Sequence, residues 1–517
     1  MTKKKVLSSI IAICLVSFLV TGCKGLLRYQ EDDNESENEL IEEGDNSSPK
    51  IDYDNKIKIS MRNPSTLNPI LNMDETVDRA LKIVFSFLVD FNENDEPVPN
   101  LAKSWSLAEG GTVVDIKLDT SIKWHDGESL KADDVIYTLK TIQEAENSPY
   151  KPCVKNILSY TASSEDTVTI VYKEPFSGYA HGLYFPVIPS HIEDLSFNPI
   201  GTGPYALESF SNNRNMLLKN NNSYFKGSPK IEEIEVIFSP DTESDLNSFD
   251  QGLIDVVSTD VIDWEKYAKN KKSNINEYMT LNYDYIGINF NKPALQEVKT
   301  RQALLYASNR EYILEKIYLY HGQVVDVPVS PSSWLYNQDL VMYESNVDKA
   351  KELLEGNTLE LNLLVNKDNR QRMSVASALQ KMYKDVGITL NIIEASEEEF
   401  MEKVQSRQFD LFLGGWNLSI IPDLSFAFHS SYGQAATNYG NYSNEQMDSI
   451  LREAFNARSN EELREEYLKM QTHFSEQLPY ISLYFRTAAL LTNEKIKGDI
   501  NPHHMNQYQN IHMWYIN

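Results

Sequence analysis

Residues 122–135 give the first indication of the fold, and they read Ile122-Lys123-Trp124-His125-Asp126-Gly127-Glu128-Ser129-Leu130-Lys131-Ala132-Asp133-Asp134-Val135. The apolar start predicts a strand that ends at Asp126-Gly127, because an Asp-Gly pair supplies the positive φ that a tight turn needs. Helical periodicity follows from residue 132 to residue 142. His125 and Asp126 are adjacent, as in an acid–base pair, but we favour the structural interpretation. A strand, a turn and a helix therefore follow one another directly.

The same alternation of elements continues along the chain. Strand-like patterns occur at residues 56–59, 113–118 and 231–237. Helical periodicity occurs at residues 77–88, 298–317, 375–386 and 444–474. Interleaved strands and helices predict an α/β fold rather than a sandwich or a bundle. Loops rich in Pro, Gly and Asn separate the elements, and none resembles a flexible linker, so we expect the chain to cross more than once between its lobes.

The amino-terminal stretch predicts secretion. A basic group at residues 3–5 precedes an apolar run at residues 6–20 and the sequence Val20-Thr21-Gly22-Cys23. This order is typical of a signal peptide, and the run is shorter than the roughly 20 apolar residues of a membrane-spanning helix. The last four residues resemble a lipobox, which implies cleavage before Cys23 and a diacylglycerol on its thiol. The nine acids between Glu31 and Asp45 then predict an extended tether over residues 23–50.

Composition limits the possible functions. The formal charge is −27, and no stripe of Lys and Arg appears, so no nucleic-acid role is predicted. Of the three cysteines, Cys14 leaves with the signal and Cys23 is acylated, so Cys153 has no disulfide partner and is expected to be a small buried hydrophobe. His503 and His504 are adjacent and would point in different directions in a regular element, so we predict no metal pair there without further ligands. No cofactor is expected.

Several motifs together resemble one family, the large extracytoplasmic solute-binding proteins of the peptide, opine and nickel class, also called the oligopeptide-binding-protein family. The resemblance covers roughly residues 57–515 and is carried in order by Leu101-Ala102-Lys103-Ser104-Trp105, residues 122–135, Pro199-Ile200-Gly201-Thr202-Gly203-Pro204-Tyr205, Tyr224-Phe225-Lys226-Gly227-Ser228-Pro229, Gln251-Gly252-Leu253-Ile254-Asp255, Tyr285-Ile286-Gly287-Ile288-Asn289, Arg301-Gln302-Ala303-Leu304 with Ala307, Phe409-Asp410 with Gly415-Trp416, Leu478-Pro479-Tyr480-Ile481-Ser482-Leu483-Tyr484, and Trp514.

The resemblance implies a two-lobed α/β fold of the periplasmic-binding-protein type (class II, Venus-flytrap). The first lobe would comprise residues 51–284 and 487–517, with an extra subdomain near residues 81–189. The second lobe would comprise residues 285–486. A ligand would lie between the lobes, and hinge closure would trap it.

The resemblance also implies where a ligand binds. Members that bind peptides place the segment after the Gly-Trp pair against the peptide, so we expect ligand contact at Gly415, Trp416, Asn417, Ser419 and Asp423. Family members usually have an aspartate three residues after the tryptophan, where it pairs with the amino terminus of the peptide. This chain has Ser419 there instead, so either Asp423 substitutes or the terminus is recognised differently or is absent.

Two further segments match the family. Residues 67–75 match an early loop that enters the cleft, and Met73 and Glu75 are the expected contacts there. Tyr285, Ile286 and Asn289 lie on a strand that resembles the second crossing between lobes, and they could act at the hinge rather than touch ligand.

The resulting hypothesis is a lipid-anchored, monomeric binding component on the outer face of the cell membrane. It would capture peptides or peptide-like solutes and deliver them to an ABC permease with its ATPases, without catalysis. A surface receptor for a signalling peptide uses the same cleft, and the sequence does not separate the two. A nickel chelate or an opine could replace the peptide. A lipid-anchored hydrolase would need a catalytic constellation, and we find no convincing candidate for one.

Overall fold

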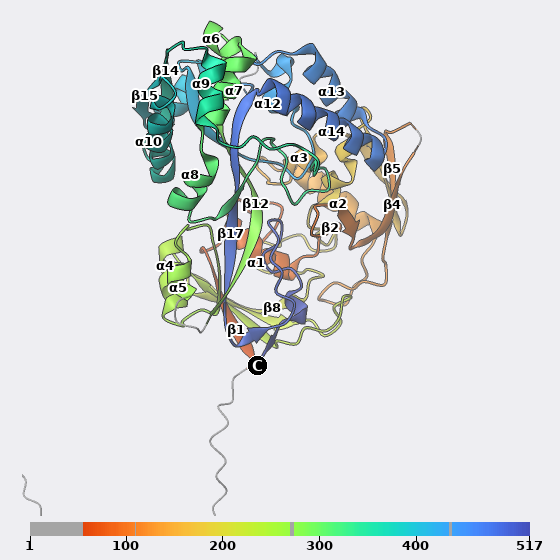
Figure 1. Ribbon diagram of the computed structural model, residues 1–517. Coiled ribbons are helices and arrows are strands. Elements are labelled where there is room, and N and C mark those ends of the chain that lie inside the picture. Colours follow the sequence, from red (N-terminus) through yellow and green to blue (C-terminus); the bar gives the residue numbers. More distant parts are fainter. Residues whose placement is uncertain (1–54, 109, 269–272, 434–436) are drawn as a thin grey trace, which may run out of the picture. The chain divides into compact units, whose positions relative to one another are not determined.

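Two long antiparallel strands, β12 (Ser273–Ile288) and β17 (Tyr480–Asn493), run between the two halves of the computed structural model (Figure 1). The structure describes residues 55–108, 110–268, 273–433 and 437–517. The expected signal peptide, Cys23 and the tether lie outside these residues. Within them, no helix is both long and apolar enough to cross a membrane.

Both long strands belong to an eleven-stranded mixed sheet of the described residues, ordered β15-β14-β16-β12-β17-β11-β1-β10-β9-β8, with β13 paired to β17. Its other strands are β1 (Lys56–Met61), β8 (Tyr205–Ser211), β9 (Asn215–Asn220), β10 (Glu233–Phe238), β11 (Val256–Thr259), β13 (Gly322–Val324), β14 (Leu359–Asn366), β15 (Ile388–Ala395) and β16 (Leu411–Asn417). The expected strands near residues 56 and 231 are the parallel neighbours β1 and β10.

A second, antiparallel sheet has the order β4-β5-β7-β6. Its strands are β4 (Ala102–Leu107), β5 (Val113–Leu118), β6 (Ile157–Ser164) and β7 (Thr167–Tyr172). The expected strand at residues 113–118 is β5, where alternate residues are buried because one face of the sheet covers the core. Two small ladders pair β2 (Val89–Phe91) with β3 (Pro97–Pro99) and β18 (Ile496–Lys497) with β19 (Tyr515–Ile516).

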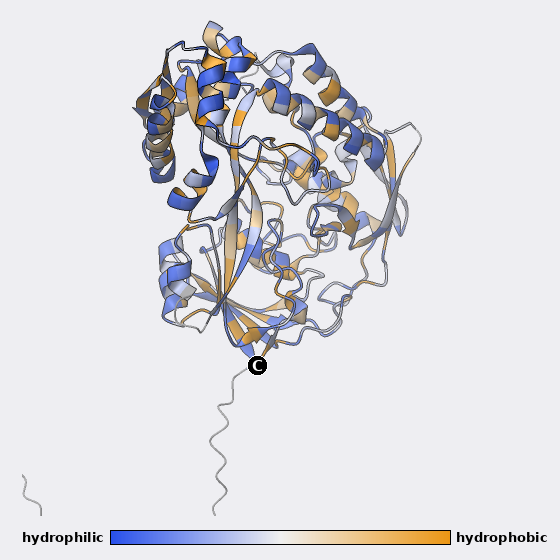
Figure 2. Cartoon of the chain, viewed as in Figure 1, coloured by the Kyte–Doolittle hydropathy of each residue, from blue (hydrophilic) through white to orange (hydrophobic). Residues whose placement is uncertain are grey.

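The helices turn hydrophilic faces outward while apolar residues gather in the strands and inner helix faces (Figure 2). They are α1 (Glu75–Val84), α2 (Ala132–Glu144), α3 (Lys151–Val154), α4 (Thr242–Asp250), α5 (Glu265–Ala268), α6 (Pro293–Gln296), α7 (Val298–Ala307), α8 (Arg310–Ile317), α9 (Val347–Leu354), α10 (Arg370–Lys384), α11 (Glu397–Gln405), α12 (Ser425–Phe428), α13 (Glu445–Asn456) and α14 (Asn460–Gln477), with 3-10 turns η1 (Ser177–Tyr179), η2 (His181–Leu183), η3 (Ser430–Gly433) and η4 (Ile511–Met513).

Two of the predicted helices are wrong in extent because a new helix starts inside each. The pattern at residues 298–317 is divided into α7 and α8, and Asn309 caps the second by accepting a hydrogen bond from the Tyr312 amide. The pattern at residues 444–474 is divided into α13 and α14, and Ser459 caps the second in the same way. Ser and Asn side chains satisfy the free amides of a first helical turn, so they start helices that periodicity alone would continue through.

The motif at residues 122–135 forms the expected turn and the expected helix α2, but the predicted strand is wrong, because residues 122–126 contribute only the isolated bridge between Lys123 and Ser129. Gly127 has a φ of +94°, and its amide donates to the Trp124 carbonyl. His125 joins this turn to a second motif, because its Nδ1 accepts from the Gly201 amide at 3.2 Å and its Nε2 lies 3.0 Å from the Gly203 carbonyl. A Cβ atom on Gly201 would lie 1.9 Å from the carbonyl oxygen at the end of α1, so only glycine permits this approach.

The buried apolar residues fall into separate cores toward the two ends of the long strands. One core is drawn chiefly from residues 57–256 and 490–514. Two others are drawn from residues 283–485, and a small one covers α4 and β11. Ile421 belongs by sequence to the second group but packs into the first core. The chain therefore has two main packed bodies that touch at residue 421.

Candidate ligand cleft

A cavity of about 740 Å³ lies beside the point where β12 and β17 pass from one packed body to the other. One wall consists of α1, residues 149–153 and residues 258–260. The facing wall consists of residues 417–421, which continue the chain beyond β16, together with Arg486 on β17. Residues from both bodies therefore line one space, which has the size of a small-ligand site.

The cavity adjoins an interruption in the sheet. The β12–β17 ladder shifts register between Met279 and Tyr283, and the intervening Thr280 hydroxyl donates to the Arg486 carbonyl at 2.6 Å. The Leu418 amide donates to the Leu281 carbonyl at 2.9 Å, which keeps the segment after β16 against the same place. A break in ladder pairing leaves room between strands that would otherwise be in contact.

Helix α1 supplies the charged face of one wall. Its apolar residues, Val77, Leu81 and Val84 among them, are buried in the first core. The opposite face carries i,i+4 ion pairs, Glu75 with Arg79 at 3.3 Å and Asp78 with Lys82 at 2.7 Å. This amphipathic pattern follows from helical periodicity. The helix therefore presents paired, rather than free, charges to the cavity.

The charged residues of the lining balance in number. The acids are Glu75, Asp78 and Asp260, and the bases are Arg79, Lys82 and Arg486. Arg486 Nε lies 2.8 Å from Asp284 Oδ2, and Arg372 Nη2 lies 3.1 Å from Asp284 Oδ1. Burial opposes the charge of Arg486, but Asp284 together with Tyr318, Asp260 and Tyr484 outweighs burial and raises the pKa of Arg486. The cleft is thus polar without a strong net charge.

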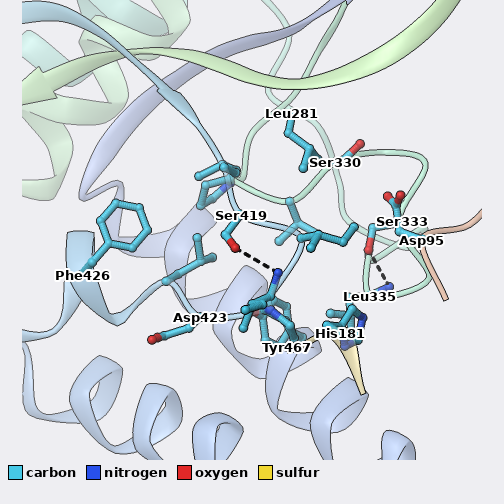
Figure 3. Close-up of a pocket in the computed structure, with 17 residues that line it drawn as sticks. Asp95, His181, Leu281, Ser330, Ser333, Leu335, Ser419, Asp423, Phe426 and Tyr467 are labelled. Atoms are coloured by element: carbon cyan, nitrogen blue, oxygen red, sulfur yellow. Dashed lines mark hydrogen bonds between the residues drawn. The ribbon is translucent and has the colours of Figure 1, made fainter. Parts of the chain in front are cut away.

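A second, smaller cavity of about 60 Å³ shares Leu281 and residues 418–421 with the large one (Figure 3). Its remaining lining includes Asp95, His181 and Asp423. Asp423 Oδ1 accepts a hydrogen bond from the Ser425 amide at 2.9 Å at the start of α12. Burial, aided by the charge of Asp423, raises the pKa of the neighbouring Tyr467 above its usual range. Two carboxylates therefore line a small space next to the cleft.

The structure brings some of the expected ligand contacts to these cavities. Glu75, Asn417 and Ser419 line the large cavity. Ser419 also lines the small one, together with Asp423, and its hydroxyl accepts from the Ile421 amide at 3.1 Å. Met73 is 64% exposed and stands outside both linings among the described residues.

Gly415 and Trp416 occupy packed positions on β16. A Cβ atom on Gly415 would lie 2.3 Å from Arg372 Nη2. The Trp416 ring stacks on Tyr439 at 5.5 Å. Within the described chain neither residue is part of either cavity lining, so contact with a ligand stays a prediction for both.

The residues expected near the hinge lie in the second body. The Tyr285 ring stacks on Tyr480 with centroids 4.1 Å apart, and Ile286 is fully buried. Asn289 follows β12 directly, and its side-chain Nδ2 donates to the Phe409 carbonyl at 2.8 Å. These contacts anchor one end of β12 in the core.

Several lining residues were missed from the sequence. Arg79 and Lys82 were visible as partners of acids four residues earlier, but that spacing indicates only an exposed helix face. Arg486 and Cys153 gave no signal. Burial raises the pKa of Cys153 to about 12, so this thiol stays protonated near neutral pH. The residue is only partly buried and lines the large cavity, so it is less buried than the sequence predicted.

The two bodies also touch at the rim of the cleft. Ile421 packs beside Gly178, where an added Cβ atom would lie 2.8 Å from the Ile421 side chain. The rings of Phe176 and Phe455 are 5.3 Å apart. Phe176 belongs to the first core and Phe455 to a helix of the second body, so apolar contact holds the bodies together at this edge.

Three comparisons with known proteins extend over most of the chain. A sequence profile described as "Bacterial extracellular solute-binding proteins, family 5 Middle" matches residues 96–439. The oligopeptide-binding protein AppA of Bacillus subtilis is 26% identical over 496 residues, which cover 88% of this chain and 90% of AppA. The structure of NikZ from Campylobacter jejuni in complex with Ni(L-His) is 25% identical, with a TM-score of 0.68, and covers 89% of this chain and 99% of NikZ. The structure of HbpA2 from Haemophilus parasuis is 23% identical, with a TM-score of 0.80, and covers 89% of this chain and 100% of HbpA2.

Proposed function

The chain belongs to the bacterial extracellular solute-binding proteins of family 5, and from this membership we propose that it captures peptides or peptide-like solutes in the cleft and delivers them to a membrane permease. The family comprises extracytoplasmic substrate-binding proteins of the peptide and nickel class for ABC importers, which are transport components and not enzymes. The predicted two-lobed α/β fold of periplasmic binding proteins is confirmed by the solved structures.

The observation that carries the proposal is the cavity of about 740 Å³ with its balanced charges. A peptide is a zwitterion, and a lining of equal positive and negative groups accepts both of its ends without net repulsion. Residues 417–421 run along this cavity. Main-chain hydrogen bonds from such a segment do not depend on the side chains of the ligand, so they suit peptides of varied sequence. The oligopeptide-binding relative supports the same choice of ligand.

Asp423 is our candidate for the group that binds the amino terminus. The usual position holds Ser419, whose hydroxyl already accepts a main-chain hydrogen bond. Asp423 uses Oδ1 for the Ser425 amide, which leaves its second oxygen to accept from an ammonium group in the small cavity. A charge-assisted bond of this kind is strongest where water is excluded.

Capture would proceed by closure of two lobes with the boundaries expected above, residues 51–284 with 487–517 and residues 285–486. The separate hydrophobic cores toward the two ends of β12 and β17 support this division. The contacts of Ile421 and Phe455 with the first body support a closed arrangement. Because β12 and β17 both cross between the bodies, these strands would carry the hinge.

Calorimetry of the purified protein tests the choice of ligand. Short-peptide pools should release heat, whereas a pool of small non-peptide metabolites should not. Mass spectrometry of material retained in the cleft during purification without refolding identifies the natural ligand. Heat only with the non-peptide pool, with a nickel chelate or an opine among its members, would refute the peptide part of the proposal.

A matched pair of peptides tests the role of Asp423. Asp423→Asn should lower the affinity for a peptide with a free amino terminus by about tenfold or more, since hydrogen bonds to charged groups contribute roughly 1.5–3 kcal/mol. The amino-acetylated form of the same peptide should bind wild type and variant alike. Asp348→Asn, on the exposed start of α9, is the control. Equal loss with both peptides would place the ammonium elsewhere while leaving capture itself intact.

We further propose that the protein acts as a monomer anchored by a lipid on Cys23 and that it serves a permease with intracellular ATPases. Cys23→Ser should abolish incorporation of labelled palmitate and release the protein from the membrane fraction. Cells without the protein should lose uptake of the peptide that the purified protein binds. Normal uptake combined with loss of a density-dependent response would instead indicate a signalling receptor.

A further inference from the structure

Asp95, His503 and His504 form a convergent group beside the cleft. His504 Nε2 lies 2.6 Å and His503 Nε2 lies 3.0 Å from the same oxygen, Asp95 Oδ1. The exposed fraction of the side chain is 5% for Asp95, 13% for His503 and 8% for His504. The imidazole rings are 4.1 Å apart. Two histidines near the carboxyl end of the sequence and one carboxylate from its first fifth therefore lie together at a position from which solvent is largely excluded.

The local backbone explains why adjacent histidines converge. They lie in a tight turn rather than a regular element, in which His503 and Asn506 exchange main-chain hydrogen bonds. The prediction that the two side chains point apart is therefore wrong, because it assumed a helix or a strand. Asp95 occupies the tip of the β2–β3 hairpin with a φ of +62°, and its amide donates to the Asn92 carbonyl.

The group has unsatisfied polar capacity and adjacent space. Asp95 is only 4% exposed, and its Oδ2 atom is buried and has no hydrogen-bond partner among the described residues. His504 lines the large cavity, and Asp95 lines the small one. An unpaired buried carboxylate oxygen is costly unless something binds it.

We propose that Asp95, His503 and His504 bind a divalent transition-metal ion of the zinc, nickel and copper class. Two imidazoles and one carboxylate are a ligand set that these ions favour. The three ligand atoms lie within 4.8 Å of one another. Ligands about 2.1 Å from a tetrahedral ion are roughly 3.4 Å apart, so shifts below about 1 Å suffice.

Ion binding replaces the present contacts of the two Nε2 atoms with Asp95 Oδ1. The ion brings two positive charges, and the carboxylate of Asp95 offsets one of them. The Nε2 lone pairs would ligate, so each ring would carry its proton on Nδ1. The His503 Nδ1 now accepts a long hydrogen bond, 3.3 Å, from the Met505 amide, and this bond would be given up. Three protein ligands leave positions open, and the two adjoining cavities have room for water or for a donor atom of a solute in the cleft.

Metal titration of tag-free protein, first stripped with a chelator, tests the site. Co²⁺ should give the absorption of a coordinated ion at one equivalent per chain, and Zn²⁺ and Ni²⁺ should displace it. Mg²⁺ and Ca²⁺, which prefer oxygen ligands, should not. Diffraction at the zinc absorption edge should place the ion between the three side chains. Absence of stoichiometric binding would overturn the proposal, whatever the protein does with peptides.

Three variants locate the ion. His503→Gln, His504→Gln and Asp95→Asn should each lower the Zn²⁺ affinity by more than the about 10–100-fold that changes outside the ligand set cost. His191→Gln is the matched control, because His191 pairs with a single carboxylate, Asp126, at 2.8 Å. Circular dichroism checks that each variant is folded. If Asp95→Asn does not fold, the two histidine variants still test the site. Unchanged affinity in both histidine variants would place the ion elsewhere and refute the site.

Discussion

Two groups of histidine and aspartate side chains in the molecule each contain a pair of residues that are adjacent in sequence, His125-Asp126 in one and His503-His504 in the other. The contacts of the two pairs differ. In the first, His125 and Asp126 are neighbours in sequence but bind different partners, the main chain near Gly201 and the side chain of His191. In the second, His503 and His504 are neighbours and bind one partner, Asp95. Adjacency in sequence therefore does not predict that two side chains act together, whereas convergence of two side chains on one atom does.

The largest expected effect comes from the convergent group. Asp95→Asn should lower the free energy of unfolding of the metal-free protein by about 3 kcal/mol, since the two buried histidines lose the carboxylate that they share. Urea denaturation followed by tryptophan fluorescence measures this change. A loss as small as that of a surface pair would mean that the three side chains do not act together.

His125 should show an intermediate effect. His125→Ala removes a donor and an acceptor that satisfy two buried main-chain groups, so the free energy of unfolding should fall by about 2 kcal/mol. Burial lowers the pKa of His125 below its ordinary value of 6.5, against the raising effect of the Gly203 carbonyl.

The pH dependence of this effect has a definite sign. Because the folded pKa is depressed, the contribution of His125 is present above pH 6.5 and is lost as the pH falls below that value. The stability difference between wild type and His125→Ala should therefore shrink from pH 7 toward pH 5. A constant difference over that range would contradict a neutral, buried His125.

The smallest effect is expected at Asp126. Its contact with His191 is partly exposed, with 30% and 35% of the two side chains accessible. Such pairs contribute about 0–1 kcal/mol and are screened by salt. Asp126→Asn should thus change the unfolding midpoint little, and less still in high salt. A change as large as that of Asp95→Asn would remove the contrast between the two groups.

Part of the fold and of the cleft was predictable from residue order. Alternation at residues 113–118 and periodicity at residues 132–142 correspond to β5 and α2, because burial of one face repeats at the period of each element. Glu75, Asn417, Ser419 and Asp423 do line cavities. The helix starts at Asn309 and Ser459 were overlooked, since a cap is a local hydrogen bond that periodicity does not register.

Residue order alone establishes the α/β class and the family resemblance, because these depend on composition and on short-range patterns. The tertiary structure alone decides that Arg486 and Lys82 share a cavity and that His503 and His504 meet Asp95. Asp95 and His504 are separated by 409 positions. No short-range pattern encodes such a contact, because it exists only once distant segments pack around a common core.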